Sequence, residues 1–274
     1  QTLDFMTLFG APDWVPRVRS RRTRRARDKV HAVIDAIMER HKAGEGDSRA
    51  VISSLFNAPG RDGKPLSDRA IRNEAIVIFM AGHETTANTL AWAFYLVSQS
   101  PRVQKKLREE HAEVLSGRVP DFADIKKLVY TRAVVEETLR LYPPVPLLGR
   151  EATAPGTCLG RELGKGDLLV VAPWLMQRNR DIWSLPDHFV PERFDPRLAP
   201  RPNKYANIPF ASGPRVCPGM TFGLVEATLC LATLFQAFDM ALVPTQEVSV
   251  DCRLTLRPSS PLHMTVRERA LAPA

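Results

Sequence analysis

Apolar residues recur at helical spacing near the start of the chain. Between residues 20 and 42 they fall three or four positions apart, at Ala26, Val30, Val33, Ile34, Ile37 and Met38. This spacing places them on one face of an α-helix whose other face is polar. Gly44 and Gly46 follow and end the predicted helix. A shorter helix is expected over residues 49–56.

A second, much longer apolar segment covers residues 67–99. Ser67 can cap its first turn, and Pro101 lies just beyond its end. Only Glu84 is charged between residues 75 and 99, and the segment is long enough that a transmembrane span must be considered. Its middle is polar, however, with His83, Glu84, Thr85, Thr86, Asn88 and Thr89. We therefore predict the long central helix of a large domain.

The remaining pattern predicts a mainly α-helical protein with small β-sheets. Further helices are expected over residues 102–115 and 130–141, and a helix that is apolar nearly all round over 221–238. Short apolar runs predict strands within residues 145–172, 248–256 and 264–266. Residues 173–218 are rich in proline and show little periodicity, and a loop of this length inside a domain is usually functional.

Composition narrows the class of protein. Hydrophobic residues make up 44% and charged residues 25% of the 274, as in ordinary globular domains. The net charge of +8 comes from one segment, because Arg17 to Lys42 carries 10 basic and 3 acidic residues. We interpret it as a solvated helix face, with an acidic partner or membrane headgroups as alternatives. No stacking or base-reading groups accompany it, so nucleic-acid binding is not predicted.

The cysteines and the start of the chain indicate a cellular compartment. Four cysteines show no paired spacing, which favours a reducing, intracellular setting. No signal-peptide pattern is present. We expect a cytoplasmic protein, with a membrane anchor upstream of residue 1 as the alternative.

Cys217 lies in the segment with the strongest chemical signal. Residues 210–219 read Phe-Ala-Ser-Gly-Pro-Arg-Val-Cys-Pro-Gly, directly before the apolar helix. Pro218 suits the first position of that helix. The free N–H groups of the first turn and the helix dipole favour a thiolate on Cys217.

The neighbours of Cys217 suit a flat ligand that carries carboxylates. Arg215 presents a planar guanidinium to a carboxylate. Phe210 can shield the sulfur, and Gly213 and Gly219 allow the backbone to approach a ligand closely.

Several roles are open to a lone cysteine of this kind. A buried structural cysteine is the commonest. Zinc would need partner ligands at a usable spacing, and a nucleophile would need a histidine base that no sequence feature identifies. A single thiolate on heme iron needs no second protein ligand on its side of the ring.

Residues 210–219 resemble the heme-binding loop of the cytochrome P-450 superfamily, Phe-x-x-Gly-x-Arg-x-Cys-x-Gly. Every fixed position is present, although many members carry Gly where Ala211 stands. Three other family motifs precede it in the family's order: Ala-Gly-His-Glu-Thr-Thr at 81–86, Glu-Thr-Leu-Arg at 137–140 and Pro-Glu-Arg-Phe at 191–194. The resemblance extends over nearly the whole chain from about Arg21. One further departure is Gln177, where a His is common.

The resemblance gives roles to the charged motifs. Glu137 and Arg140, three apart on one helix, can pair. With Arg193 they would form a network that holds the proline-rich loop under the heme. Arg150 and Arg215 match positions that pair with the heme propionates.

The resemblance also assigns roles to the centre of the long helix. Ala81 and Gly82 are small enough for heme and oxygen to lie against the helix. Glu84 and Thr85 would be the catalytic pair that relays protons as a general acid. Thr85 can also hydrogen-bond its own backbone and loosen the helix. His83 is interpreted as structural.

Two stretches match substrate-facing positions of the family. They contain Val145, Leu147 and Leu148, and Leu262. Because they are apolar, we expect a small apolar substrate, with an ordinary hydrophobic core as an equal alternative at each position.

The resemblance implies that residues 1–274 form the carboxy-terminal portion of one heme-thiolate monooxygenase domain, with the cytochrome P-450 fold lacking its amino-terminal helices. The reaction would insert one oxygen atom of O2 into the substrate. Electrons would come from a separate ferredoxin or flavoprotein reductase. Two alternatives are a catalytically incomplete fragment, inactive because one heme face is open to water, and a peroxide-dependent heme-thiolate enzyme, against which the Glu84–Thr85 pair argues.

Overall fold

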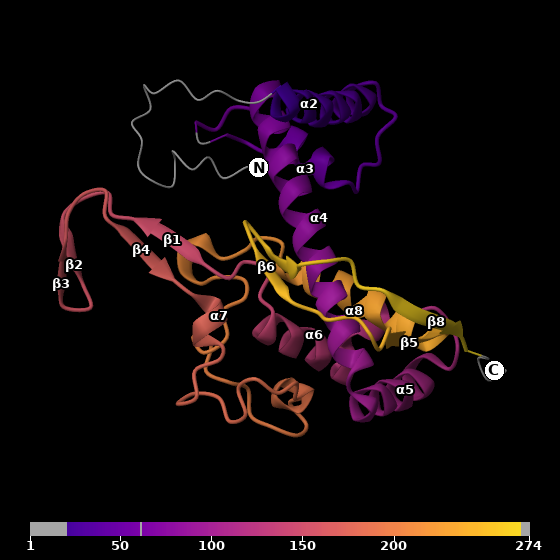
Figure 1. Cartoon of the computed structure of the whole chain (residues 1–274). Coiled ribbons are helices and arrows are strands. Elements are labelled where there is room, and N and C mark those ends of the chain that lie inside the picture. The colour runs from indigo at the N-terminus through magenta and orange to yellow at the C-terminus, as the bar shows by residue number, and fades with distance from the viewer. Residues whose placement is uncertain (1–20, 61, 270–274) are drawn as a thin grey trace. The chain divides into compact units, whose positions relative to one another are not determined.

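The structure, a computed structural model, describes residues 21–60 and 62–269 (Figure 1). It divides into two compact units whose boundary falls between His83 and Glu84, inside one long helix. The predicted irregular segment 1–20 lies outside the described residues.

The first unit contains helices α2 (Arg21–Lys42) and α3 (Val51–Asn57) and the beginning of α4 (Asp68–Ser98). The predicted amphipathic helix is therefore confirmed as α2. Ile34 and Met38, on its apolar face, pack with Ile71 of α4 into a small core. His41 stacks on Phe56 with ring centroids 4.8 Å apart. The arginines at the start of α2 are exposed.

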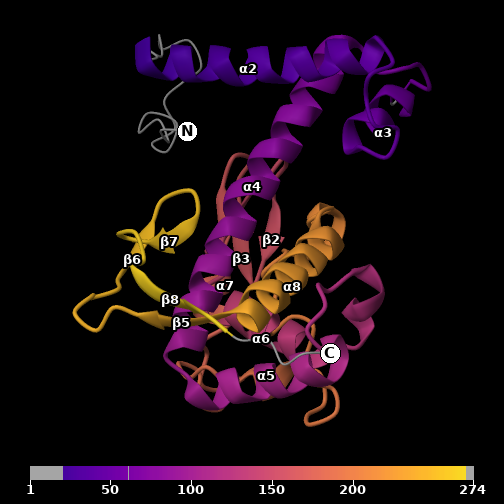
Figure 2. The same cartoon turned by 90° about the vertical axis from the view of Figure 1, so that its right-hand side faces the viewer.

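Helix α4 runs for 31 residues and begins where the sequence predicts (Figure 2). The hydroxyl oxygen of Ser67 accepts the N–H of Ala70 at 3.3 Å, which satisfies a donor of the first turn. Within the described residues, one helix is long and apolar enough to cross a membrane by length and composition, and it is α8 (Met220–Ala237). The buried side chains of α8 belong to the protein core.

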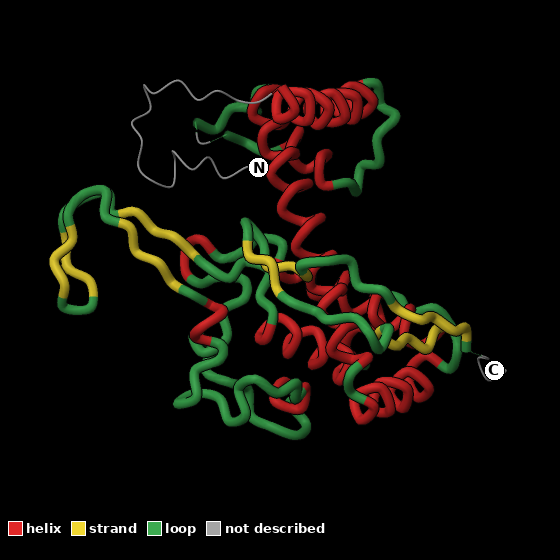
Figure 3. The backbone as a smooth tube through the Cα atoms, viewed as in Figure 1, coloured by secondary structure: helices red, strands yellow, loops and turns green. Residues whose placement is uncertain are grey.

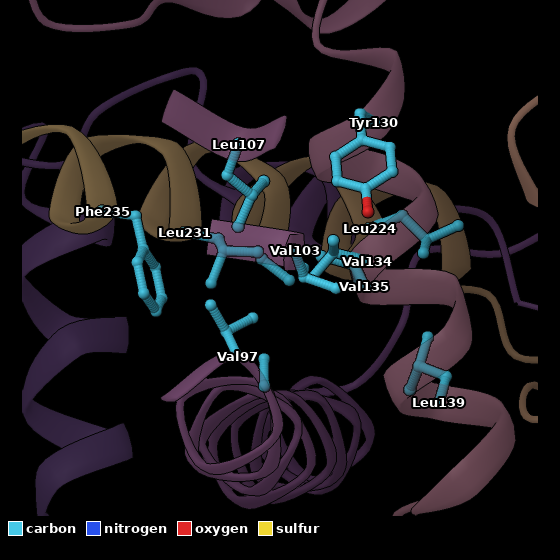
Figure 4. Close-up of a cluster of buried hydrophobic side chains, with 12 residues drawn as sticks. Val97, Val103, Leu107, Tyr130, Val134, Val135, Leu139, Leu224, Leu231 and Phe235 are labelled. Atoms are coloured by element: carbon cyan, nitrogen blue, oxygen red, sulfur yellow. The ribbon is translucent and has the colours of Figure 1, made fainter. Parts of the chain in front are cut away.

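The core of the second unit forms where four helices meet (Figure 4). Helices α5 (Pro101–Leu115), α6 (Val129–Leu141) and α8 pack together with the C-terminal part of α4. Their apolar faces supply fully buried side chains, among them Val97, Val103, Leu107, Val134 and Leu231. The predicted helices at these positions are confirmed. A short 3₁₀ helix, η1 (Phe122–Lys126), was not predicted, and it begins with a capping box on Asp121.

In the part of the chain that the structure describes, the strands form four two-stranded antiparallel sheets (Figure 3). Strands β1 (Leu148–Glu151) and β4 (Leu168–Val171) pair, as do β2 (Gly156–Cys158) and β3 (Arg161–Leu163). Near the end of the chain, β5 (Phe238–Leu242) pairs with β8 (Met264–Glu268), and β6 (Val250–Cys252) with β7 (Leu256–Pro258). The sequence prediction extended the helix to Phe238 and missed β5, whose residues alternate between half-buried and exposed.

The proline-rich segment is irregular, as predicted. It contains only the short helix α7 (Pro173–Met176) and the 3₁₀ turns η2 (Pro191–Phe194) and η3 (Gly213–Arg215). A small cluster of Trp183, Phe194 and Ala206 attaches it to Ala133 of α6. This segment ends in residues 210–219, the loop that contains Cys217 and is called the cysteine loop below.

Candidate functional site

Cys217 lies at the end of a tight loop, residues 210–217, which contains η3 and precedes α8. Its N–H donates to the carbonyl oxygen of Phe210 at 2.9 Å and so closes the loop. Ala211 and Gly213 inside the loop have φ angles of 62° and 74°, in the left-handed region that favours glycine. The cysteine is exposed, so its sulfur is accessible to a ligand.

The start of α8 falls between the two predicted positions, one residue before the predicted range 221–238 and two residues after Pro218. The helix begins at Met220 with Gly219 as its N-cap, so Pro218 precedes the cap and is not the first helical residue. The N–H of Met220 is directed back to the carbonyl oxygen of Cys217, at 3.4 Å. A β-carbon at Gly219 would lie 3.8 Å from the Cys217 sulfur. Glycine therefore leaves one side of the sulfur uncovered.

The predicted charged network is assembled. Nε and Nη2 of Arg140 donate to the two carboxylate oxygens of Glu137 at 2.7 and 2.8 Å, and both side chains are fully buried. Nε of Arg193 lies 3.5 Å from Oε1 of the same carboxylate. The backbone N–H of Val190 donates to that oxygen at 2.9 Å. Burial raises the pKa of Glu137, and the guanidinium of Arg140 opposes the rise.

Arg140 also anchors the proline-rich segment. Its Nη1 donates to the carbonyl oxygens of Gln177 and Pro186, both at 2.7 Å, and its Nη2 to that of His188 at 3.1 Å. One guanidinium thus satisfies three loop carbonyls and a carboxylate. This use of all its donors explains why a buried arginine is tolerated here.

Gln177 is a buried residue whose contacts the sequence analysis missed. Its Nε2 donates to the carbonyl oxygens of Leu139 and Arg140, at 3.1 and 2.9 Å. Its Oε1 accepts the N–H of Ile208 at 2.9 Å. The only sequence signal was the departure from a common histidine.

At the centre of α4, Glu84 is held by a second residue that sequence reasoning missed. The hydroxyl of Thr255, between β6 and β7, donates to Oε1 of Glu84 at 2.5 Å. Asn88, one turn along α4, donates to the Thr255 hydroxyl oxygen at 3.3 Å. Thr255 is 5% exposed, so the carboxylate of Glu84 is fixed by a buried hydroxyl.

The rest of this α4 segment lies near the start of α8. A β-carbon at Gly223 would lie 4.0 Å from Oγ1 of Thr86. Because Gly223 follows Cys217 by six positions, the cysteine loop and the Glu84–Thr85 pair belong to neighbouring parts of the second unit. Ala81 and Gly82, just before this pair in the chain, are exposed, and a β-carbon at Gly82 would contact nothing within 4 Å.

Arg150 and Arg215, the predicted propionate partners, are both exposed. Arg150 lies on β1, and its Nη1 donates to the carbonyl oxygen of Gly149 at 2.8 Å. Within residues 21–60 and 62–269, neither arginine forms an ion pair with a carboxylate. Their guanidinium groups are therefore available to an anionic ligand.

The predicted substrate-facing residues lie in different surroundings. Leu262 lines an open cleft of about 530 Å³ together with Asn88, Ala91 and Phe94 of α4. Val145, Leu147 and Leu148 do not line that cleft. Val145 and Leu148 are half-buried, and Leu147 is exposed. A common pocket for all four stays a prediction.

A mainly helical fold with small sheets, in which a buried Glu–Arg–Arg network supports a cysteine loop before an apolar helix, is characteristic of the heme-thiolate class. The chain belongs to the cytochrome P450 family, whose model, Cytochrome P450, matches residues 2–266.

Curated relatives agree with the family assignment. Cyclooctatin synthase of Streptomyces melanosporofaciens is 34% identical over 93% of this chain and 56% of the relative. Carotene epsilon-monooxygenase, chloroplastic, of Arabidopsis thaliana is 36% identical over 74% of this chain and 39% of the relative. Human Cytochrome P450 4V2 is 34% identical over 81% and 43%. The chain spans about half the length of the curated relatives it matches.

Proposed function

We propose that this chain is the carboxy-terminal part of a heme-thiolate monooxygenase in which Cys217 is the ligand of the heme iron. The observation that supports this most strongly is the loop that holds Cys217, which is closed by its own backbone and linked through Ile208 and Gln177 to Arg140 of the buried network. The name of one relative, a carotene monooxygenase, supports an apolar substrate.

The residues present fit a heme. The exposed sulfur of Cys217 would bind the iron, and Phe210 and Gly219 would border the ring. Arg150 and Arg215, which have no carboxylate partner among the described residues, would bind the propionates. When bound, the heme would supply the activation of O2 and the insertion of one oxygen atom into the substrate.

On the other side of the site, protons would pass through Glu84 and Thr85. The buried hydroxyl of Thr255 would hold the Glu84 carboxylate in one orientation, so that it delivers protons along a fixed direction. Ala81 and Gly82 would leave space beside the helix. This arrangement supports the use of O2 over the use of peroxide, because peroxide already carries the protons that O2 requires.

The apolar residues Val145, Leu147, Leu148 and Leu262 would contact a small apolar substrate. Electrons would reach the heme from a separate ferredoxin or flavoprotein reductase. The Arg17 to Lys42 segment is a candidate surface for an acidic partner, and its positions 17–20 lie outside the described residues.

The experiment that tests the proposed function is spectroscopic. The chain is reconstituted with heme, reduced and exposed to carbon monoxide. We expect a strongly red-shifted Soret band that is lost in Cys217→Ala and retained in Cys252→Ala, a control with another exposed cysteine. Bound heme whose spectrum is unchanged in Cys217→Ala would contradict the thiolate assignment. Absence of heme uptake would support the incomplete-fragment alternative.

A further inference from the structure

The amide of Gln177 joins two segments that the proposed site depends on. It is fully buried, and its hydrogen-bonding capacity is directed at the backbone. Two donations reach the carbonyl oxygens at the C-terminal end of α6, and one acceptance comes from Ile208. An amide supplies both functions at once because it carries a donor group and an acceptor group.

The hydrogen bonds of the Gln177 side chain form a bridge between the end of α6 and Ile208, and each side of this bridge is connected to the proposed site. The α6 end includes the backbone of Arg140, whose side chain binds Glu137 and donates back to the Gln177 carbonyl oxygen. The other end is Ile208, whose carbonyl oxygen accepts the N–H of Ala211 at 3.0 Å. Two residues after Ile208, Phe210 accepts the N–H of Cys217. The bridge thus connects the buried ion pair to the entry of the cysteine loop.

We propose that Gln177 is a positioning residue for Cys217, which fixes the entry of the cysteine loop to α6 through a neutral amide and so keeps the loop in one conformation independently of pH. The proposal deepens the proposed function, because it matters chemically only if Cys217 is the ligand. The proposal predicts how rigidly the loop is held, and this rigidity can be measured without heme.

The choice of an amide has a consequence for pH dependence. A neutral imidazole at this position can donate from one nitrogen and accept from the other, and so can replace the bridge in part. A protonated imidazole has two donors and no acceptor, so it cannot accept the N–H of Ile208, and two donors would face each other. The charged groups of this region are Arg140 and Glu137 of α6, Arg193 of η2, and the adjacent Arg178 with its partner Asp187. Three of these five are cations, which further disfavour a charged imidazole.

The first test measures amide hydrogen exchange of Ile208 and Cys217 in the full chain without heme. In Gln177→Leu we expect both amides to exchange at least about tenfold faster, as the loss of a buried hydrogen bond predicts. The matched control is Gln236→Leu on α8, since Gln236 is also buried and donates to a backbone carbonyl, that of Arg118, at 2.9 Å. We expect it to leave both rates within about twofold.

Two outcomes would overturn the proposal. If Ile208 exchanges faster and Cys217 does not, Gln177 stabilises only its own neighbour. If Gln236→Leu accelerates Cys217 equally, the effect reflects global stability. Neither outcome bears on heme ligation, which the spectroscopic test decides separately.

A second variant, Gln177→His, keeps the test decisive if the leucine variant does not fold. At pH 8 its Ile208 and Cys217 amides should be protected nearly as in the parent chain, after correction for intrinsic exchange. At pH 5.5 the imidazole is protonated when the loop opens and exposes it, at its ordinary pKa of about 6.5, but not when it is buried, so opening is favoured and both amides should exchange about tenfold faster relative to the parent. A ratio to the parent chain that stays constant over this range contradicts the proposed role of the neutral amide.

Discussion

Ala211 shows how a single residue can sit in a conformation that its side chain disfavours. Its φ of 62° lies in the left-handed region, where a β-carbon costs about 1–2 kcal/mol. It lies next to the backbone bond that closes the cysteine loop. The family's frequent glycine at this position therefore has a physical reason, and this chain retains strain that glycine would relieve.

We expect Ala211→Gly to stabilise the chain by about 0.5–1 kcal/mol, because relief of the strained φ exceeds the extra flexibility of glycine in the unfolded chain. The free energy of unfolding in urea measures it. Ala199→Gly is a matched control, since Ala199 is also in the proline-rich segment but not at positive φ. It should destabilise, and equal effects of the two changes would contradict the explanation.

His111 is a buried histidine outside the candidate site. Its side chain is 2% exposed, and its Nε2 lies 2.9 Å from the hydroxyl of Thr131. Burial, with a smaller contribution from the charge of Arg269, lowers its pKa to about 4. It is therefore neutral in the folded protein at pH 6, whereas a histidine in the unfolded chain, with a pKa of about 6.5, is largely protonated there.

Between pH 6.5 and 4 the unfolded state binds a proton that the folded state does not. Stability should therefore fall as pH decreases through this window, by up to about 3 kcal/mol, and this contribution should level off below pH 4. Urea unfolding at a series of pH values measures it. His111→Gln should lack this part of the pH dependence, so parallel curves for the two proteins would refute the assignment.

At the scale of elements, the hydrophobic period was the reliable signal. Helices α2, α4, α5 and α6 lie within one or two residues of their predictions because an apolar stripe and a clear terminator mark each one. Strand β5 was missed because the apolar run of α8 continues into it without a break. β5 is extended because it pairs with β8, which lies more than 20 residues further along the chain.

The β2–β3 hairpin turns through Leu159 and Gly160, whose φ angles are 50° and 74°. A two-residue turn with both central residues at positive φ strongly prefers Asn-Gly. Leu159 is 98% exposed, so its side chain gains no packing there.

We expect Leu159→Asn to stabilise this hairpin by about 0.5–1 kcal/mol, since asparagine tolerates the left-handed region better than leucine. Hydrogen exchange of the amides of Thr157 and Glu162, on the paired strands, should slow by about threefold or more. Leu198→Asn, at another exposed leucine, is the control and should leave these amides unchanged.

At the scale of the whole second unit, Arg140 connects α6 with three parts of the proline-rich segment. Residues 177–190 are also held to that helix by the Gln177 amide, by the N–H of Val190 on Glu137 and by the packing of Trp183 on Ala133. The network contains a buried carboxylate and guanidinium, so removal of one partner leaves the other charged and unpaired.

We expect Arg140→Met to lower the free energy of unfolding by about 3–5 kcal/mol. Lys105→Met on α5 is the control, because Lys105 pairs with Glu109 on the surface and its loss should cost less than about 1 kcal/mol. Urea unfolding compares the two. Similar losses would show that the buried network contributes no more than a surface pair.

The sequence by itself determined the long helices, the position of the cysteine loop and the residues of the Glu137–Arg140–Arg193 network. The helices follow from the local spacing of apolar residues, and the loop and the network follow from short motifs that can be recognised in the sequence. It also identified Gln177 as unusual, without the reason.

Only the tertiary structure decided what holds these parts in place. Gln177 meets Ile208 across 31 positions, and Thr255 meets Glu84 across 171. Threonine and glutamine are common, and nothing near them in the chain distinguishes these two from others. The N–H of Ile208 and the carboxylate of Glu84 need hydrogen-bond partners inside the protein. Which residue becomes the partner depends on how distant parts of the chain come together in the fold.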